Sequence, residues 1–193
     1  MLDTGIFNAD RYFDVFVEYA KASPTDILIQ IGICNRGPDE SVVHVLPTLW
    51  FRNIWAWWPD EPKPSLKDAS GKNGAGAIAA ADATVGDYFL HCEGHARLLF
   101  TENETNNDRL FGSPNSTPYV KDGINNFVVA GREHAVNPNH TGTKAAAHYQ
   151  LRIGAGATAI IRLRLSNAAP GAEQPLIKLS RRACARPTSS IGP

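Results

Sequence analysis

Apolar residues recur at every second position in several short stretches of this chain. In residues 26–35, four isoleucines alternate with other residues until an Asn-Arg-Gly-Pro turn at residues 35–38 ends the run. Residues 11–19 show the same alternation. A period of two places successive side chains on opposite faces of a β-strand, so these stretches predict strands rather than helices.

Further strand-like stretches follow, separated by Gly, Pro and Asn. They span residues 41–49, 87–91, 97–101, 126–130, 145–153 and 158–166. The first three strands of the chain are expected to form an antiparallel meander. Pro47 should end its strand or place it at a sheet edge, because proline cannot donate a hydrogen bond to a β-ladder. Gly154 and Gly156 predict a hairpin between the last two strands.

This pattern predicts an all-β protein, an antiparallel β-sandwich with long irregular loops, over residues 1–166. No amphipathic helix of ten or more residues is expected. Residues 61–76 are rich in Pro, Gly and Lys without periodicity and are expected to form an exposed loop. We expect residues 167–193 to be a disordered tail, because they become basic and rich in Ser and Pro from residue 178.

The charge balance excludes several classes of partner. The chain has 19 Lys and Arg against 19 Asp and Glu, so nothing favours nucleic acid or an anionic membrane. No stretch approaches the roughly 18 consecutive apolar residues of a membrane helix. Residues 1–4 show neither the basic region nor the apolar core of a signal peptide, so a cytoplasmic location is expected.

The cysteines and histidines give no reason to expect a metal or another cofactor. Cys34, Cys92 and Cys184 are odd in number and widely spaced, which predicts buried, reduced thiols. His91 and His95 flank Glu93 at a period of two, a spacing that one strand face could use for a metal. The glycine at position 94 indicates a turn instead, and we predict no metal site.

All four tryptophans lie within residues 50–58 (WFRNIWAWW). In an extended segment Trp55 and Trp57 would point the same way, with Arg52 on the opposite face. Aromatic rings beside an arginine are typical of a sugar-stacking surface and also of a protein interface. We favour the interface and expect Trp55 or Trp57 to be unusually exposed.

A polar segment, TENETNNDRLFG at residues 101–112, offers side chains of a second kind. Glycoside cleavage normally requires two carboxyl groups, and Glu102 and Glu104 could share one face of an extended segment. We favour the alternative that this segment forms hydrogen bonds that hold a long loop. No residue is assigned a catalytic role. The candidates for substrate binding or a domain interface are Arg52, Trp55, Trp57, Glu102, Asn103, Glu104, Asn106, Arg109 and Asp122.

Five long segments carry a family resemblance: residues 3–38, 44–57, 98–112, 119–129 and 135–149. They resemble, in order, the glucosidase-like and mannosylglycerate-hydrolase-like bacterial members of glycoside hydrolase family 63. The resemblance covers about residues 2–166. It implies part of a super-sandwich that precedes an (α/α)6 barrel, and in that family the barrel carries the catalytic carboxylates. None of the residues here matches the catalytic acid or base.

The resemblance implies an accessory N-terminal β-sandwich fragment of a glycoside hydrolase that acts on α-glucosidic or related bonds. The fragment itself is expected to be non-catalytic, with the absent barrel domain as its partner. One alternative is a stand-alone carbohydrate-binding module that binds an oligosaccharide. Another is a non-functional remnant of a truncated gene, in which case the downstream nucleotides should encode helical-barrel sequence.

Overall fold

The computed structural model describes residues 5, 11–58, 60–71 and 75–170. Strands dominate this part of the chain, as the alternation predicted, and the all-β class is confirmed. The strands are β1 (Phe13–Ser23), β2 (Asp26–Asn35), β3 (Ser41–Val45), β4 (Thr48–Trp50), β5 (Ser65–Asp68), β6 (Gly76–Asp82), β7 (Gly86–Cys92), β8 (Arg97–Thr101), β9 (Thr141–Gly142), β10 (Lys144–Ile153) and β11 (Thr158–Ser166). The helices are α1 (Asn107–Phe111), α2 (Gly123–Ala130) and the short 3-10 helix η3 (Glu133–Ala135).

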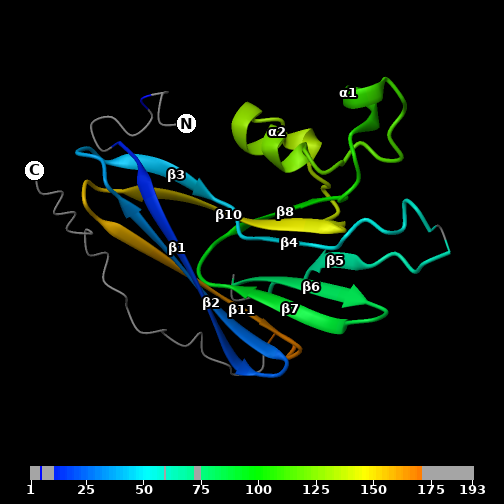
Figure 1. The fold of residues 1–193 in the computed structure, drawn as a ribbon, viewed down its shortest axis with the longest axis horizontal. Coiled ribbons are helices and arrows are strands. Elements are labelled where there is room, and N and C mark those ends of the chain that lie inside the picture. Colours follow the sequence, from blue (N-terminus) through cyan, green and yellow to red (C-terminus); the bar gives the residue numbers. More distant parts are fainter. Residues whose placement is uncertain (1–4, 6–10, 59, 72–74, 171–193) are drawn as a thin grey trace, which may run out of the picture.

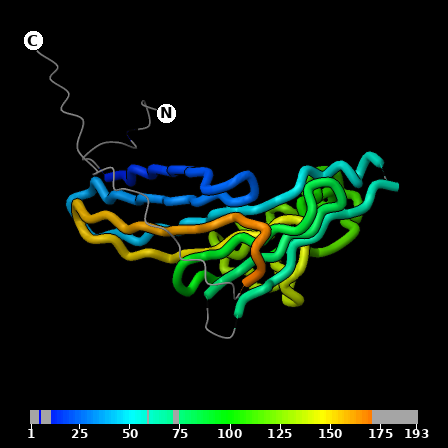
Figure 2. Tube along the Cα trace, turned by 90° about the horizontal axis from the view of Figure 1, so that it is seen from below, coloured from blue at the N-terminus to red at the C-terminus, as the bar shows by residue number. Residues whose placement is uncertain are grey.

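The strands form two antiparallel sheets (Figure 1). The larger sheet has the order β1-β2-β11-β7-β6-β5-β9. The smaller sheet has the order β3-β10-β4, and β8 pairs with β10. Seen at right angles to the first view, β1 and β2 run along one outer side of the molecule (Figure 2). The smaller sheet has fewer strands and therefore cannot cover the whole inner face of the larger one.

Strands β3 and β4 act as one strand that is interrupted at Pro47. Both pair with β10 in the same register, because Tyr149 faces Val45 and Ala146 faces Thr48. Between them the carbonyl of Pro47 accepts a hydrogen bond from the amide of Ala147 at 3.0 Å. The proline interrupts the ladder because it has no amide hydrogen to donate, as expected from the sequence.

The core lies between the two sheets. Phe100 and Leu98 of β8 pack with Ile33, Ile78 and other buried residues of the larger sheet. The intervening Leu99 faces the opposite way and packs against α2, which covers the outer face of the smaller sheet. Both faces of β8 and of the N-terminal half of β10 are therefore buried. This explains why small alanines at positions 145–147, all with no exposed surface, occupy β10.

The prediction of a strand at residues 126–130 is wrong, because this segment belongs to helix α2. Its buried residues Ile124 and Phe127 are three apart, which is the helical spacing. Gly131 ends the helix in the left-handed conformation with φ of 63°. Short apolar runs do not distinguish a strand from a buried helix by periodicity alone. The described residues contain no helix of ten residues or more, in agreement with the sequence analysis.

Two predicted strand connections are also wrong. Strands β1 and β2 do form a hairpin, but β3 leaves that sheet and pairs with β10, so there is no three-stranded meander. The turn containing Gly154 and Gly156 joins β10 to β11 without making a hairpin, because β11 pairs with β2 and β7 in the other sheet. Turn chemistry predicts a reversal of the chain but not the sheet that the next strand enters.

The described part of residues 61–76 is not a simple exposed loop. Strand β5 lies within them, paired with β6 and β9, and Leu66 has no exposed surface. The expected disordered tail lies outside the described residues from position 171 onward. Cys34 and Cys92 are buried free thiols, as predicted, whereas Cys184 lies outside the described residues. No helix in the described part of the chain is long and apolar enough to cross a membrane.

Candidate functional site

The tryptophan segment forms a turn and is not extended. The carbonyl of Ile54 accepts hydrogen bonds from the amides of Trp57 and Trp58, both at 3.0 Å. The side chain of Asn53 accepts a third hydrogen bond, from the amide of Ala56, at 3.2 Å. The expectation that Trp55 and Trp57 share one face rested on an extended segment, and the turn separates them.

Trp57 and Trp58 form the exposed side of this turn. Trp57 is 64% exposed and Trp58 57%, which confirms the prediction of an unusually exposed tryptophan. Their rings meet edge to face, with centroids 5.8 Å apart. The guanidinium carbon of Arg52 lies 5.9 Å from the centroid of Trp57, so Arg52 lies beside this ring and not on the opposite face. The result is an exposed surface of two indoles and one cation.

Trp55 is half-buried and belongs to a polar network beneath the turn. Its indole nitrogen donates to Oε1 of Glu104 at 3.0 Å. The ammonium of Lys63 lies 3.0 Å from the same oxygen and 3.1 Å from Oε2 of Glu102. It also lies 5.6 Å from the centroid of the Trp55 ring. Glu102 and Glu104 therefore do share one face, as expected, and Lys63 bridges them.

Further hydrogen bonds reach Oε2 of each carboxylate. Oε2 of Glu104 accepts from the hydroxyl of Ser116 at 2.5 Å. Oε2 of Glu102 accepts from the hydroxyl of Thr143 at 2.7 Å, and that hydroxyl accepts from the amide of Asn103 at 2.8 Å. The side chain of Asn103 donates to the carbonyl of Phe51 at 2.8 Å and so ties the tryptophan turn to the network.

These contacts favour the charged forms of Glu104 and Lys63. Burial favours a higher pKa for Glu104, but the hydrogen bonds from Ser116, Trp55 and Lys63 outweigh it and lower the pKa below its ordinary value. Burial likewise favours a lower pKa for Lys63, but Glu104 and Glu102 raise it overall. A glycosidase general acid requires a raised carboxyl pKa, and Glu104 has the opposite shift.

Replacing Glu104 with Gln should weaken the fold at neutral pH by about 1 to 2 kcal/mol, because charged hydrogen bonds are lost. A carboxyl group whose pKa is lowered in the folded state stabilises the fold above its unfolded pKa, which is close to 4.5. That contribution disappears as the pH falls through the lowered folded pKa. Urea unfolding between pH 7 and pH 3 should therefore show a shallower loss of stability in Glu104→Gln than in the native chain. Glu133→Gln, whose side chain is 77% exposed, should follow the native profile.

A second cluster closes the loop that contains α1. The side chain of Asn106 caps this helix by accepting from the amide of Arg109 at 3.1 Å, and it donates to both oxygens of Asp122 at 3.1 Å. The guanidinium of Arg109 contacts Asp122 at 3.1 Å. Asn115 donates to Asn106 at 3.0 Å and accepts from the amide of Asn107 at 2.7 Å. Asn106, Arg109 and Asp122 thus form loop-holding contacts of the kind that the sequence analysis favoured.

Sequence reasoning missed four members of these clusters: Lys63, Asn115, Ser116 and Thr143. Lys63 lies in the segment that was expected to be an exposed loop, and no local pattern relates it to the two glutamates. Ser116 and Thr143 reach the carboxylates only through the folding of distant segments. Their residue types carry no signal that could have found them.

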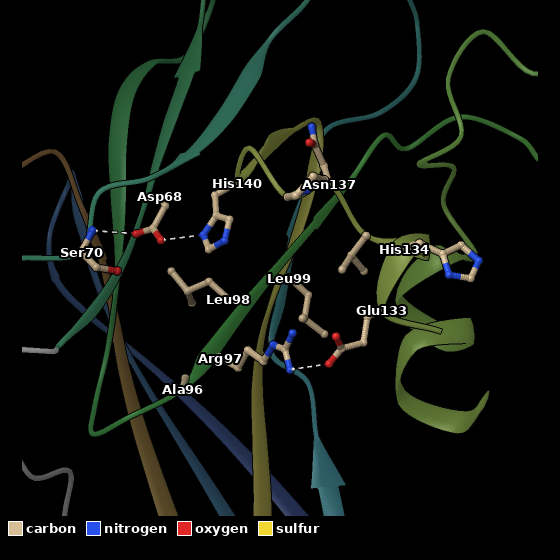
Figure 3. A pocket seen from close by; sticks show the side chains of 12 residues that line it. Asp68, Ser70, Ala96, Arg97, Leu98, Leu99, Glu133, His134, Asn137 and His140 are labelled. Atoms are coloured by element: carbon tan, nitrogen blue, oxygen red, sulfur yellow. Dashed lines mark hydrogen bonds and ion pairs between the residues drawn. The ribbon is translucent and has the colours of Figure 1, made fainter. Parts of the chain in front are cut away.

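A separate polar hollow of about 620 Å³ lies between the end of β5, strand β8 and the segment around η3 (Figure 3). Nδ1 of His140 lies 3.0 Å from the carboxylate of Asp68. Burial favours a higher pKa for Asp68, but hydrogen bonds from Ser70 and His140 lower it overall. On the other side Arg97 lies 3.6 Å from Glu133, with its guanidinium 4.5 Å from the centroid of the Phe127 ring. Internal pairs thus engage both acidic side chains that line the hollow.

The His-Glu-His stretch does not assemble a metal site. His91 contacts the carbonyl of Ala168 at 3.1 Å, while Glu93 forms an ion pair with Arg162 at 3.1 Å. Gly94 lies between them and His95 in a turn with φ of 69°. In the described part of the chain, no three His, Cys, Asp or Glu side chains are grouped as metal ligands.

Comparisons with known proteins give one informative similarity. No protein-family model matches the chain. The chain is similar to the uncharacterized protein YMR196W of Saccharomyces cerevisiae, with 31% identity over 182 residues. The match covers 81% of this chain but 17% of the yeast protein. The chain thus spans about one sixth of the length of that relative.

Proposed function

We propose that this chain is an accessory β-sandwich domain that docks, through its exposed tryptophan turn, against another domain of a glycoside hydrolase. The proposed whole enzyme hydrolyses α-glucosidic or related bonds, and its partner domain is an (α/α)6 barrel, as the resemblance to family 63 implies. The sandwich itself performs no chemistry in this proposal.

The exposed surface of Trp57, Trp58 and Arg52 is the observation that carries the proposal. Large exposed aromatic groups beside an arginine are typical of protein interfaces. The turn that presents them is fixed by its own backbone hydrogen bonds and by the contact of Asn103 with Phe51. A fixed aromatic surface loses little conformational entropy on docking.

The carboxylates behind this surface support a non-catalytic role. Glu104 already accepts hydrogen bonds from Trp55, Lys63 and Ser116. Glu102 contacts Lys63 and Thr143. Substrate or water would have to displace these partners, and each displacement leaves a charge less well compensated. The network is suited to holding the turn and not to transferring protons.

The yeast relative is consistent with a domain that works as part of a longer protein, because the matched region is a small share of its length. A cytoplasmic location belongs to the same proposal. It is supported by the buried thiols of Cys34 and Cys92, neither of which is bonded to another described cysteine.

The purified chain should give no turnover of maltose or para-nitrophenyl α-glucoside above the uncatalysed rate. Product release over a day, followed by chromatography, measures this directly. Turnover that disappears in Glu102→Gln, while Glu133→Gln keeps it, would show that this network is an active site and would refute the non-catalytic role.

Binding of sugar by the tryptophan surface is the second candidate function, and the exposure of Trp57 beside Arg52 favours it. A carbohydrate-binding module should give saturable heat when the chain is titrated with maltotriose. Trp57→Ala should then weaken the affinity at least tenfold, a loss of about 1.4 kcal/mol or more. Val129→Ala, which shortens another exposed apolar side chain, on α2, is the matched control.

A further inference from the structure

Strand β1 forms one end of the larger sheet and, within the described part of the chain, leaves an edge open. Its residues pair with β2 from Phe13 to Ser23, and no other described strand pairs with its second edge. The strand follows the outer side of the molecule in Figure 2. An open edge presents a row of backbone donors and acceptors that can add a further strand.

The usual protection of an open edge is weak here. Natural edges carry lysines, prolines or bulges that prevent pairing. Between Phe13 and Ala20 strand β1 contains none of these, and Lys21 and the bulge lie at its far end. Its two carboxylates are already engaged, since Asp14 contacts Arg36 at 2.6 Å and Glu18 accepts from the side chain of Gln30 at 3.2 Å.

The inner face of β1 adds an apolar groove to this open edge. Val15 is 55% exposed, Val17 47% and Tyr19 71%. These three side chains line a groove of about 440 Å³ between the sheets. The groove continues over Ile29, Ile31, Leu90, Leu163 and Leu165 of the larger sheet and over residues 45–49 of the smaller one. The incomplete cover of the smaller sheet leaves this surface open.

We propose that the occupant of this edge is a second copy of the same chain, paired antiparallel along β1 about a two-fold axis perpendicular to the sheet. Such an axis keeps the inner faces of both copies on the same side. In the register centred on Val17, that residue faces its own counterpart and Val15 faces the partner's Tyr19. The two apolar grooves then lie side by side across a continuous sheet.

Repulsion between like charges disfavours the two adjacent registers. Centring the pair on Phe16 places Asp14 opposite the partner's Glu18, and centring it on Glu18 places two glutamates opposite each other. Like charges directly opposite each other destabilise a strand pair. A further shift toward the C-terminus places Val17 opposite the partner's Lys21, and a further shift toward the N-terminus shortens the overlap. The register centred on Val17 has a long overlap and opposes no like charges. It joins Val15, Val17 and Tyr19 of the two copies at its centre and leaves Lys21 opposite the partner's Phe13 only at its ends.

Sedimentation velocity of the full chain across a wide concentration series tests this pairing. The native chain should show a monomer–dimer equilibrium. Val17→Lys should raise the dimer dissociation constant at least about tenfold, because two lysines then face each other at the centre of the pair. Val17→Glu should do the same. An equimolar mixture of the two variants should recover a dimer, because the opposed residues then carry opposite charges.

Val129→Lys, which changes an exposed apolar residue elsewhere, should leave the native equilibrium unchanged, and Trp57→Lys tests the tryptophan turn as the alternative interface. Circular dichroism of every variant checks that the fold is retained. A native chain that stays monomeric, or a dimer that survives Val17→Lys, would overturn the proposal. So would a dimer that Trp57→Lys disperses while Val17→Lys does not, because that result moves the interface to the tryptophan turn.

Discussion

Replacing Gly142 with alanine should destabilise the fold by about 3 kcal/mol, because there is no room for a side chain at this position. A Cβ atom on Gly142 would lie 2.2 Å from the carbonyl oxygen of Thr101 and 2.8 Å from its carbonyl carbon. Both are backbone atoms of a buried strand end and cannot rotate away. Residue 142 pairs with Leu66 on its other side, so β9 cannot shift without breaking that ladder.

The same substitution should disturb the polar network. The amide of Thr143 donates to the carbonyl of Thr101 at 3.1 Å, and the hydroxyl of Thr143 holds Glu102. Moving β9 away from Thr101 therefore moves one of the supports of the carboxylates. Urea unfolding measures the stability. Gly154→Ala is the matched control, since a Cβ atom there meets its nearest neighbour at an ordinary 4.0 Å. Equal effects of the two substitutions would contradict the steric argument.

Replacing Asp26 with alanine should also cost about 3 kcal/mol or more, because it removes the carboxylate from a buried guanidinium. Nε of Arg164 donates to one oxygen of Asp26 at 2.8 Å, and a terminal nitrogen donates to the other at 2.5 Å. The two side chains are 10% and 13% exposed. Water cannot easily take the place of the carboxylate, so the arginine keeps its charge with weaker compensation.

The exposed pair between Arg11 and Asp39 provides the comparison for this effect. Its atoms are also 2.8 Å apart, but its side chains are 61% and 66% exposed. Asp39→Ala should change the stability little, because solvent screens the lost attraction. Chemical denaturation of both variants at pH 7 tests the pair of expectations. If Asp26→Ala proves as mild as Asp39→Ala, burial does not set the strength of the Arg164 contact.

The sequence contained enough information to identify most strands but not to place them in sheets. The strand-like stretch at residues 97–101 coincides with β8, and the isoleucine run coincides with β2. Periodicity reports which face a side chain occupies and gives no pairing partner. Strand β6 (GAIAAAD) was not predicted, because alanine has little preference for strands and only its pairing with β5 and β7 fixes it.

The candidate site shows the same limit at the level of side chains. Glu102 and Glu104 could be predicted to share a face, because they are two residues apart in an extended segment. Lys63, which joins them, comes from a segment without periodicity, and only the completed fold brings it there. The clustering of the tryptophans predicted an exposed ring. The turn at Ile54 was not predicted, because the argument from side-chain period assumed an extended segment. Local patterns predicted the chemistry, and long-range contacts decided the geometry.

Hydroxyl-radical footprinting of the tryptophans tests the proposed docking role most directly. The isolated chain would be compared with a chimera in which it replaces the matching region of the yeast relative. Trp57 and Trp58 should react rapidly in the isolated chain, and in the chimera their rates should fall to that of the half-buried Trp55. Rates of Trp57 and Trp58 that stay high in a folded chimera would contradict the claim that another domain covers this surface.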